Sequence, residues 1–566
     1  MDKMLYTNNC KKRITLLKNI LIFMSIFSFL ETAIFSDIYL NSFIFFAWLS
    51  IITSISFIFL ISIKRCNITC FDISILALII IQILVNILNN TLIIYHQSII
   101  KMLVLLLWMI SLRNLCRNNY RNTTRIFTGI LIFWMIMQLY HFIITWGISN
   151  FIFYNYYNSV SYSILFSFVS SFLIIQIFHS KLQEKKRFPL IALLIGSNIF
   201  VFANFNSRTL LLVLVATCIY VLYKIDKKKK IIIMYSILFF STLLIAFTYK
   251  TESSMGRMFI WKNTLHILYD NLVSGIGIGK FPTIYMEYQV NYFTNKGITN
   301  KYSLLAGNTS FAYNDILEFL CKFGILQCFT AFTCLYLTYK ECIKKSIYKN
   351  IIFLLSLIAL TSCFNYTMQI LFIQVFVICL LALLKPKHIL KLPSQIGNTI
   401  VFILVCTLGI FYFHLYPHLN SKQTVLFTNS NKKILETTPS YLVHEAFSNF
   451  AIKEYDSCIQ NLNKLFYYAK TDELELLYGK SYKELGLYNL AEKSFQRAIN
   501  MYPSKYINRY ELMLLYKEYI KDHTKGINVA KEIININEKI PTGLSKLIIN
   551  SAISYIKEKD ENYFSD

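Results

Sequence analysis

Two arginines in polar stretches are the side chains best suited to chemistry in this chain. Arg208 follows Ser207 between two long apolar runs, and Arg257 lies four residues before Trp261 in a polar, aromatic-rich segment. A guanidinium group is planar and presents several N–H donors, so it can bind a phosphate group through two hydrogen bonds at once. The two arginines therefore predict a site for a phosphate-bearing anion. Two alternatives stay open, in which Arg208 is an end cap that reaches out of the bilayer and Arg257 meets lipid head groups.

Arg257, Trp261 and Thr264 fall on one face of a helix, because they are spaced at i, i+4 and i+7. The spacing predicts an amphipathic helix over 255–268 that lies in the membrane interface. His266 is the only histidine of the segment. At about 100° per residue it points away from Arg257, which makes it a poor candidate for a base.

Gly275, Gly277 and Gly279 alternate with isoleucines just before Lys280. Glycines at this spacing allow a tight backbone whose exposed amides can bind an anion, and a plain turn between two elements is an equal alternative. The run is not a nucleotide-binding P-loop, because Lys280 is followed by phenylalanine where that motif needs serine or threonine.

The composition requires a membrane protein. Of 566 residues, 55% are hydrophobic and 15% are charged, and the mean hydropathy is +0.49, values that a soluble domain does not need. Basic residues outnumber acidic ones by 56 to 30. They fall in short clusters between apolar runs, which argues against nucleic acid as a partner. Cys66 and Cys70 lack the nearby histidines or further cysteines of a metal site, and we expect no metal ion and no cofactor.

Thirteen apolar runs of about 17 to 25 residues lie between residues 15 and 416, each long enough to cross a bilayer. Lysines and arginines gather in every second connection, which predicts a cytoplasmic N-terminus. The ninth run, 230–248, precedes a polar loop at about 249–316 that contains Arg257 and the three glycines. This loop is predicted to face outward. A miscount by one span would move the C-terminal part of the chain to the cytoplasm.

Near residue 430 the composition changes to amphipathic, charge-balanced sequence, which predicts a second domain at 430–566 after a membrane domain at 1–425. Small and aromatic residues there recur at the spacing of a tetratricopeptide repeat (TPR), with a weaker copy before and a degenerate one after. The best copy comprises Gly479, Tyr482, Ala491, Phe495, Ala498 and Pro503. We expect an all-α protein, a polytopic membrane helix bundle of about 12–13 spans with a C-terminal TPR-like α-solenoid that docks a protein partner or the substrate.

The order of these motifs resembles the O-antigen ligase and polymerase family of bacterial membrane glycosyltransferases, over roughly residues 190–340. In that family a large periplasmic loop holds an arginine-rich site for a glycan linked to undecaprenyl diphosphate. The resemblance implies this donor, and an acceptor that is lipid A core, another glycan or a protein. It also implies the bacterial inner membrane, with its lipids around the chain and the loop in the periplasm, and the count of thirteen spans predicts the C-terminal repeats on the same side. The resemblance is carried by Asn206-Ser207-Arg208-Thr209, Gly256-Arg257 with Trp261, the run from Gly275 to Phe281 with Tyr285, and Asn314 with Gly324-Ile325.

The resemblance implies roles for single residues as well. The expected catalytic residues are Arg208, Arg257, Tyr313 and Asn314. The expected substrate-binding residues are Ser207, Trp261, Gly275, Gly277, Gly279, Lys280 and Tyr285.

Tyr313 departs from the family, whose ligases carry a histidine before the asparagine, although the spacing from Asn314 to Gly324-Ile325 is intact. An unperturbed tyrosine has a pKa of about 10 and is a poor base at neutral pH. Three alternatives stay open. An arginine lowers the pKa of Tyr313, or Asp315 or Glu318 accepts the proton, or the protein is a polymerase-like or inactive relative.

Metal-independent glycan transfer at the outer face of the membrane is the leading functional hypothesis. Polymerisation of a polysaccharide by the same chemistry is one alternative, and a non-catalytic membrane anchor for a docking domain is another. A transporter of lipid-linked glycans would need polar or charged residues in mid-span, and apart from Lys101 and a few uncharged polar residues the sequence has little of this kind.

Overall fold

The structure is a computed structural model in which almost every element is an α-helix. The predicted ninth span, 230–248, and the predicted domain boundary, 425–430, lie outside the residues that it describes. The described residues are 13–27, 38–63, 66–88, 92–117, 120–146, 159–205, 207–225, 251–298, 301–345, 348–384, 386, 388–391, 393, 395–406, 439–536 and 542–559.

Eight of the described helices are long and apolar enough to cross a membrane. A helix satisfies its own backbone hydrogen bonds and rises about 1.5 Å per residue, so about 20 apolar residues cross the hydrocarbon layer. These helices confirm the expected all-α architecture and indicate a multi-pass membrane protein. They are α2 (Ile38–Ser62), α3 (Cys70–Leu88), α4 (Leu92–Cys116), α5 (Tyr120–Trp146), α7 (Ser159–Phe178), α8 (Glu184–Phe205), α9 (Arg208–Ile225) and α13 (Asp315–Ile343).

Two further apolar helices are shorter than the predicted spans at 350–366 and 368–384. α14 (Lys349–Ser362) has 14 residues and α15 (Leu371–Leu383) has 13. Each is about 20 Å long, so neither crosses a hydrocarbon layer of about 30 Å by itself. The residues between them form a half-buried connection that contains a short 3-10 turn, η2 (Thr367–Gln369). The remaining described helices of this part are 13–27 and Gln395–Cys406.

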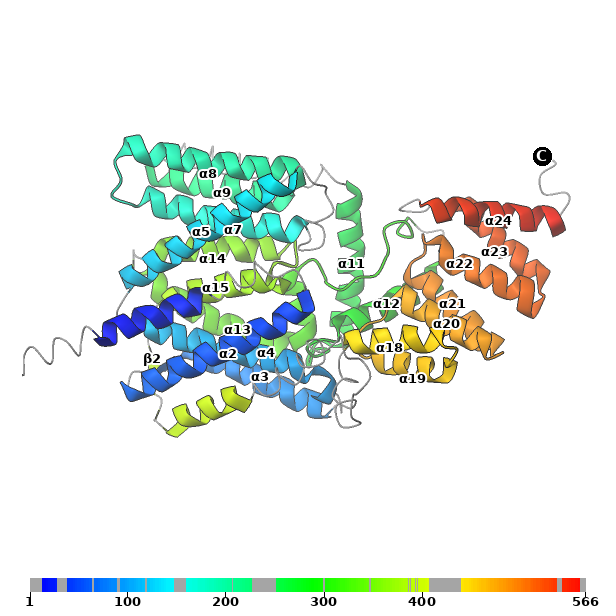
Figure 1. The fold of residues 1–566 in the computed structure, drawn as a ribbon, viewed down its shortest axis with the longest axis horizontal. Helices are drawn as coiled ribbons and strands as arrows, with labels where there is room; N and C mark the ends of the chain where they lie inside the picture. Colours follow the sequence, from blue (N-terminus) through cyan, green and yellow to red (C-terminus); the bar gives the residue numbers. More distant parts are fainter. Residues whose placement is uncertain are drawn as a thin grey trace, which may run out of the picture.

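Long-range contacts join the connections at one end of the bundle (Figure 1). Strand β1 (Asn67–Thr69), between α2 and α3, pairs antiparallel with strand β2 (His388–Lys391), which follows α15. Arg113 of α4 donates to Thr69 of β1 and forms a buried ion pair with Asp72 of α3 at 2.7 Å. Both paired connections carry basic residues that predict the cytoplasmic side, so the pairing agrees with the predicted alternation of the spans.

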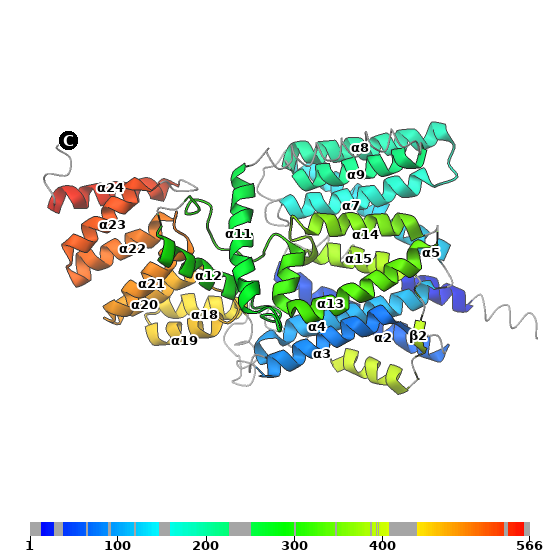
Figure 2. The ribbon, with the colours of Figure 1, turned by 180° about the vertical axis from the view of Figure 1, so that it is seen from behind.

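The polar loop forms two helices, α11 (Thr251–Asp270) and α12 (Phe281–Lys296). α11 runs crosswise to the helices of the bundle and lies at the end opposite the strand pair (Figures 1 and 2). It packs against α12 and α13, and the residues of its buried face include Phe259, Thr264 and Ile267. The predicted helix over 255–268 is therefore present, and it is held against the protein along this face.

The C-terminal helices lie at the same end of the molecule as α11 and stack along the chain (Figure 1). Gly479 shows why small residues are needed in this stack, because a methyl group there would come within 2.6 Å of the Phe495 ring. The described elements are α18 (Pro439–Ala451), α19 (Tyr455–Leu465), α20 (Asp472–Glu484), α21 (Tyr488–Met501), α22 (Tyr506–Leu514), the π-helical turn η3 (Leu515–Ile520), α23 (His523–Asn535) and α24 (Gly543–Lys559).

Hydrogen bonds join these C-terminal helices to the loop. Gln289 Nε2 of α12 donates to the Met501 carbonyl at 2.6 Å. Asn308 and Asp472 exchange two hydrogen bonds, of 2.7 and 3.1 Å. The loop and the C-terminal helices therefore lie together at one end of the molecule.

Candidate functional site

Arg208 is the first residue of α9 and reaches across to α11. Its Nη1 donates to Ser254 Oγ at 3.0 Å and its Nη2 donates to Ser253 Oγ at 3.1 Å. Ser253 and Ser254 were not predicted as site residues. The signal that could have found them is their spacing, because they precede Arg257 by one helical turn and so lie near its face of the helix.

Arg257 lies beside the same contact. Its Nη1 donates to the carbonyl of Phe364 at 2.7 Å, and its guanidinium carbon lies 5.5 Å from the centre of the Tyr313 ring. Burial lowers the pKa of Arg257, and the positive charge of Arg208 lowers it further. Ser254, which Arg208 contacts, lies three residues before Arg257 on α11, so the two predicted arginines lie near each other.

The connection between α14 and α15 forms another wall of the site. Tyr366 stacks on Phe311 with ring centres 5.1 Å apart, and its edge meets Tyr313 at the same separation. Asn365 Nδ2 donates to Thr209 Oγ1 of α9. From the sequence alone, these residues are only a break between two predicted spans. The missed signal is the polar pair at 365 and 367 between two predicted apolar runs.

Several buried polar atoms around this site have no hydrogen-bond partner among the described residues. They include Ser207 Oγ, Trp261 Nε1, Asn365 Oδ1, Thr367 Oγ1 and Asp315 Oδ1. Each of these residues lies close in the sequence to Arg208, Arg257, Tyr313 or Tyr366, at most one helical turn away. Buried polar atoms without partners are costly and few in folded proteins. Their concentration here indicates a place for water or a polar ligand.

Tyr313 supports Arg257, and its environment disfavours a role as a base. Burial raises the pKa of Tyr313, Tyr366 raises it further, and Arg257 opposes the shift only in part. The hypothesis that an arginine lowers this pKa is therefore wrong, because desolvation of the phenolate outweighs the attraction of the guanidinium group. The backbone of Tyr313 is in the left-handed region, with φ of 53°, and its ring lies under the Arg257 guanidinium.

Asn314 has a structural role at the start of α13. Its side-chain oxygen accepts a hydrogen bond from Leu317 N at 3.0 Å and so caps the helix. Asp315 follows, with Oδ2 accepting from Met368 N at 2.8 Å. This bond ties the start of α13 to the connection between α14 and α15 and leaves Oδ1 as the carboxylate oxygen without a partner among the described residues.

Glu318 is the other carboxylate considered as a proton acceptor, and both of its oxygens are occupied. Oε2 accepts from Ala312 N at 2.8 Å, and Oε1 accepts from Gln369 Nε2 at 3.0 Å. Oε1 also lies 2.6 Å from Lys322 Nζ. These contacts hold the segment before α13 and the turn η2 together, so Glu318 is a structural anchor.

The glycine run docks on a kink in α13. The helix is interrupted at Gly324, where φ is 71°, and the kink frees backbone carbonyls that a regular helix would use. Ile276 N donates to the Cys321 carbonyl at 2.8 Å, and Gly277 N donates to the Lys322 carbonyl at 3.0 Å. We name this backbone contact between 272–277 and 321–325 the glycine clasp.

The glycine clasp occupies the amides that were considered for an anion site. Gly277 N is bound as above, and Gly275 N donates to the Asn271 carbonyl at 2.9 Å. An added Cβ at Gly275 would come within 2.5 Å of the Lys322 carbonyl oxygen. An anion nest at Gly275 and Gly277 is therefore incorrect. Gly275 and Gly277 instead form a plain turn between two elements, which was the alternative that the sequence allowed.

Gly279, Lys280 and Tyr285 lie where the run enters α12. Gly279 has φ of 85°, and burial lowers the pKa of the half-buried Lys280. Tyr285 is 0% exposed and packs against Phe281 with ring centres 5.8 Å apart. Tyr285 therefore belongs to the core of the loop, while contact of Gly279 or Lys280 with a substrate stays a prediction.

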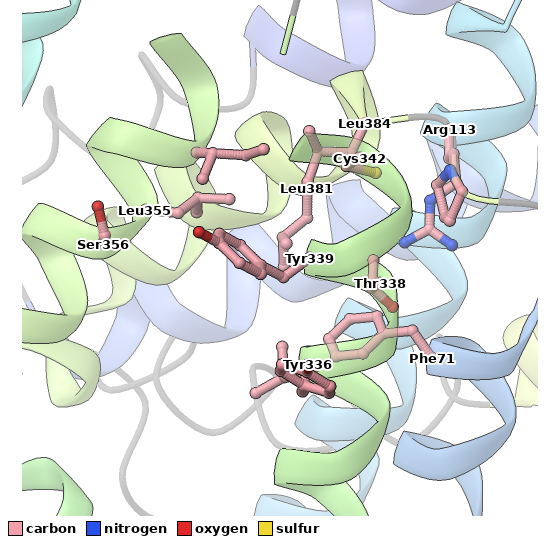
Figure 3. A pocket seen from close by; sticks show the side chains of 13 residues that line it. Phe71, Arg113, Tyr336, Thr338, Tyr339, Cys342, Leu355, Ser356, Leu381 and Leu384 are labelled. Atoms are coloured by element: carbon pink, nitrogen blue, oxygen red, sulfur yellow. The ribbon is translucent and has the colours of Figure 1, made fainter. Parts of the chain in front are cut away.

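A separate cavity of about 290 Å³ opens at the other end of the bundle, where α13 and α15 end (Figure 3). Its walls are mainly apolar and include Phe71, Tyr336 and Tyr339. Arg113 at its edge is already paired with Asp72. None of the predicted site residues lines this cavity, so it is distinct from the candidate site.

Comparison of the chain with models of protein families, with curated proteins and with solved structures found no match. The groups brought together at the site are Arg208, Arg257, Tyr313 and the neighbouring unpartnered polar atoms, while the glycine run and Tyr285 support the loop. Among the described residues, histidine, cysteine, aspartate and glutamate form no cluster that could hold a metal ion. The site brings together two guanidinium groups, a carboxylate and nearby hydroxyl, amide and indole groups.

Proposed function

We propose that this protein transfers a glycan from a polyprenyl-diphosphate carrier to an acceptor at the outer face of the bacterial inner membrane. The proposal joins the resemblance to the O-antigen ligase and polymerase family with one observation. Arg208 and Arg257, from separate elements, converge at the boundary between the membrane bundle and the loop. A pair of guanidinium groups at that depth suits a diphosphate whose lipid lies in the bilayer.

The arginines would act on the leaving group. As the bond between the anomeric carbon and the diphosphate oxygen breaks, its electron pair stays on that oxygen and negative charge grows there. Arg208 and Arg257 would stabilise this charge in a partly water-excluded site, where such interactions are stronger than in water. The amino end of α9, at Arg208, adds its partial positive charge to the same region.

Asp315 is the carboxylate that best fits the proton acceptor. The acceptor hydroxyl would attack the anomeric carbon through its oxygen, and its proton would pass to Asp315 Oδ1. The Asp315 carboxylate interacts with the Ser362 hydroxyl, and Oδ1 meets no donor in hydrogen-bond geometry among the described residues. The other candidates fit less well, since burial raises the pKa of Tyr313 and the carboxylate of Glu318 is occupied by three contacts.

The C-terminal helices would serve as a TPR-like solenoid that docks a protein partner or the acceptor. Two features support the assignment as a TPR-like solenoid. Gly479 receives the Phe495 ring in close contact, and Ala491 and Ala498, on the same helix as that ring, are fully buried. Small residues at such positions let paired helices approach closely.

The direct test is the variant Arg208→Lys, which keeps the charge and loses the planar pair of donors. Purified protein in nanodiscs, supplied with a polyprenyl-diphosphate-linked glycan and an acceptor, should lose transfer by about 100-fold or more, because transition-state contacts of this kind are worth that much. Arg121→Lys is the matched control, since Arg121 is exposed at the start of α5. Normal transfer by Arg208→Lys would contradict the proposal.

A deletion strain separates the related functions by its glycan profile. Loss of glycan attachment with accumulation of the precursor indicates ligation, and attachment of single units indicates polymerisation. Intact chain length and attachment combined with failed outward delivery of the precursor indicates a transporter. An unchanged profile would leave the non-catalytic docking protein as the better description.

A further inference from the structure

The side of α11 away from its buried face carries a row of exposed apolar side chains. Tyr269 is 81% exposed, more than any other large hydrophobic side chain of the described loop. Met255, Met258, Leu265 and Tyr269 recur every three, four or seven residues, which places them on one side of α11, and Leu272 and Val273 continue the row in the turn after the helix. We name this row the α11 stripe, and it comprises Met255, Met258, Leu265, Tyr269, Leu272 and Val273.

The α11 stripe is continuous with the outer surface of a membrane-spanning helix. The carbonyl of Leu272 accepts a hydrogen bond from Ile325 N of α13 at 2.8 Å. From Ile325 the exposed apolar side of α13 continues through Leu326 to Phe329, which is 72% exposed. Since α13 is long and apolar enough to cross the membrane, these exposed side chains are the ones that face lipid.

Among the residues that the structure describes, the contacts of α11 leave this side uncovered. Phe259, on another side of the helix, packs against Tyr292 and Tyr302 of the loop. Lys262 is the charged residue within the row, and its Nζ lies 5.1 Å from the centre of the Tyr292 ring of α12. The ammonium group is thus drawn toward α12, as in the snorkelling of a lysine at a membrane surface.

We propose that the α11 stripe lies in the interfacial layer of the bilayer, in contact with phospholipid. A helix that is parallel to the membrane surface and apolar on one side binds in this way, with its apolar side chains at the boundary between head groups and acyl chains. The crosswise orientation of α11 (Figures 1 and 2) and its unbroken connection to the lipid-facing side of α13 favour a lipid surface over a protein partner.

This contact would set the depth of the candidate site. Arg257 precedes Met258 of the α11 stripe directly in the chain, so a stripe in the interfacial layer holds its guanidinium group near the level of the phosphates. The inference does not require glycan transfer, because it depends only on the exposed side chains and on the membrane span next to them.

Site-specific photocrosslinking tests the contact in the full-length protein. A benzophenone amino acid replaces Leu265 or Tyr269 in separate variants, each reconstituted in phospholipid nanodiscs, irradiated and analysed by mass spectrometry. Phe329 of α13 is the matched position for lipid contact. Leu547 of α24 is the matched exposed position away from lipid, with 65% exposure.

Phospholipid adducts at Leu265 and Tyr269 should form in yields similar to that at Phe329, and about tenfold above that at Leu547, because only positions within the bilayer or its interface meet lipid. Adducts to a second copy of the chain would overturn the proposal and identify the α11 stripe as a protein interface. Absence of adducts at both positions, while Phe329 is labelled, would overturn it as well and place the stripe in water.

Discussion

At Tyr313 the backbone takes a left-handed conformation that places a phenol ring against the guanidinium group of Arg257. A cation over an aromatic face is stabilised by the ring itself and does not need the hydroxyl group. Tyr366 meets the same ring at its edge. The residue at this position therefore orients an arginine, and under the proposed function the proton acceptor would be another group. Asp315, two residues later, is a neighbouring carboxylate whose Oδ1 meets no donor in hydrogen-bond geometry among the described residues.

Substitutions at these two positions should separate the roles. Tyr313→Phe keeps the ring and should retain glycan transfer within about threefold, whereas Asp315→Asn should lower it by about 100-fold or more if that carboxylate accepts the proton. The measurement is the rate of transfer in nanodiscs, with folding checked by gel filtration. A collapse of activity in Tyr313→Phe with normal activity in Asp315→Asn would reverse the assignment.

The glycine clasp is an interaction between elements. It joins the turn after α11 to the kink of α13 through backbone hydrogen bonds, and it requires the two backbones to approach more closely than side chains allow. An added Cβ at Gly324 would come within 2.2 Å of the Val273 carbonyl oxygen. The clasp thus couples the loop to a membrane span, and the positions of Arg257 and Trp261 on α11 depend on it.

Gly275→Ala should destabilise the protein by at least about 2 kcal/mol, because the new methyl group meets backbone atoms that cannot move aside cheaply. Gly297→Ala is the matched control, since Gly297 also has positive φ, at 75°, but nothing lies within 4 Å of an added Cβ. It should cost only about 1 kcal/mol of backbone strain. Thermal unfolding in detergent micelles measures both, and equal losses in the two variants would rule out the close approach.

On the scale of the whole molecule, the loop and the C-terminal helices are held together by an ionic network. Glu287 of α12 pairs with Lys470 and lies 2.7 Å from Arg497. Arg497 also contacts Glu475 of α20 at 2.8 Å. Burial opposes ionisation of Glu287, but its contacts with Lys470 and Arg497 more than offset this, and its pKa is lowered from the ordinary value of 4.5.

Glu287→Gln should loosen the attachment of the C-terminal helices to α12. The expected loss is on the order of 1 kcal/mol, because the side chains of this network are partly exposed to solvent. Hydrogen exchange of the α12 amides should accelerate in Glu287→Gln. It should stay unchanged in Glu473→Gln, which removes an exposed carboxylate paired with Lys505 inside the C-terminal part.

The same network gives a pH dependence of definite sign. A carboxyl group whose pKa is lowered by folding stabilises the folded state fully above its ordinary pKa, and this contribution is lost as pH falls through the lowered value. Protection of α12, corrected for the intrinsic effect of pH on exchange, should therefore decrease below about pH 4.5 in the wild type. A smaller change is expected in Glu287→Gln, and identical profiles would show that another group controls the attachment.

Properties that depend on neighbours along the chain could be read from the sequence. Apolar runs of sufficient length predict membrane helices because a bilayer leaves backbone groups no partner outside the helix. Basic clusters such as Lys64 and Arg65 predict that the connection after α2 and the connection after α15 lie on the same side of the membrane. The strands β1 and β2 pair these two connections. Helical spacing likewise predicted the face that Arg257 and Trp261 share.

Tertiary structure decided what depends on approach between distant segments. No local pattern shows that Arg208 meets Ser254, or that the residues between α14 and α15 reach Arg257 and Asp315, since these contacts arise only when separate helices pack. The glycine run could equally have been a nest or a turn from its spacing alone. The kink at Gly324 frees two carbonyls of α13 that accept hydrogen bonds from Ile276 N and Gly277 N. These amides therefore form a turn, because an N–H group that already has a partner cannot bind an anion.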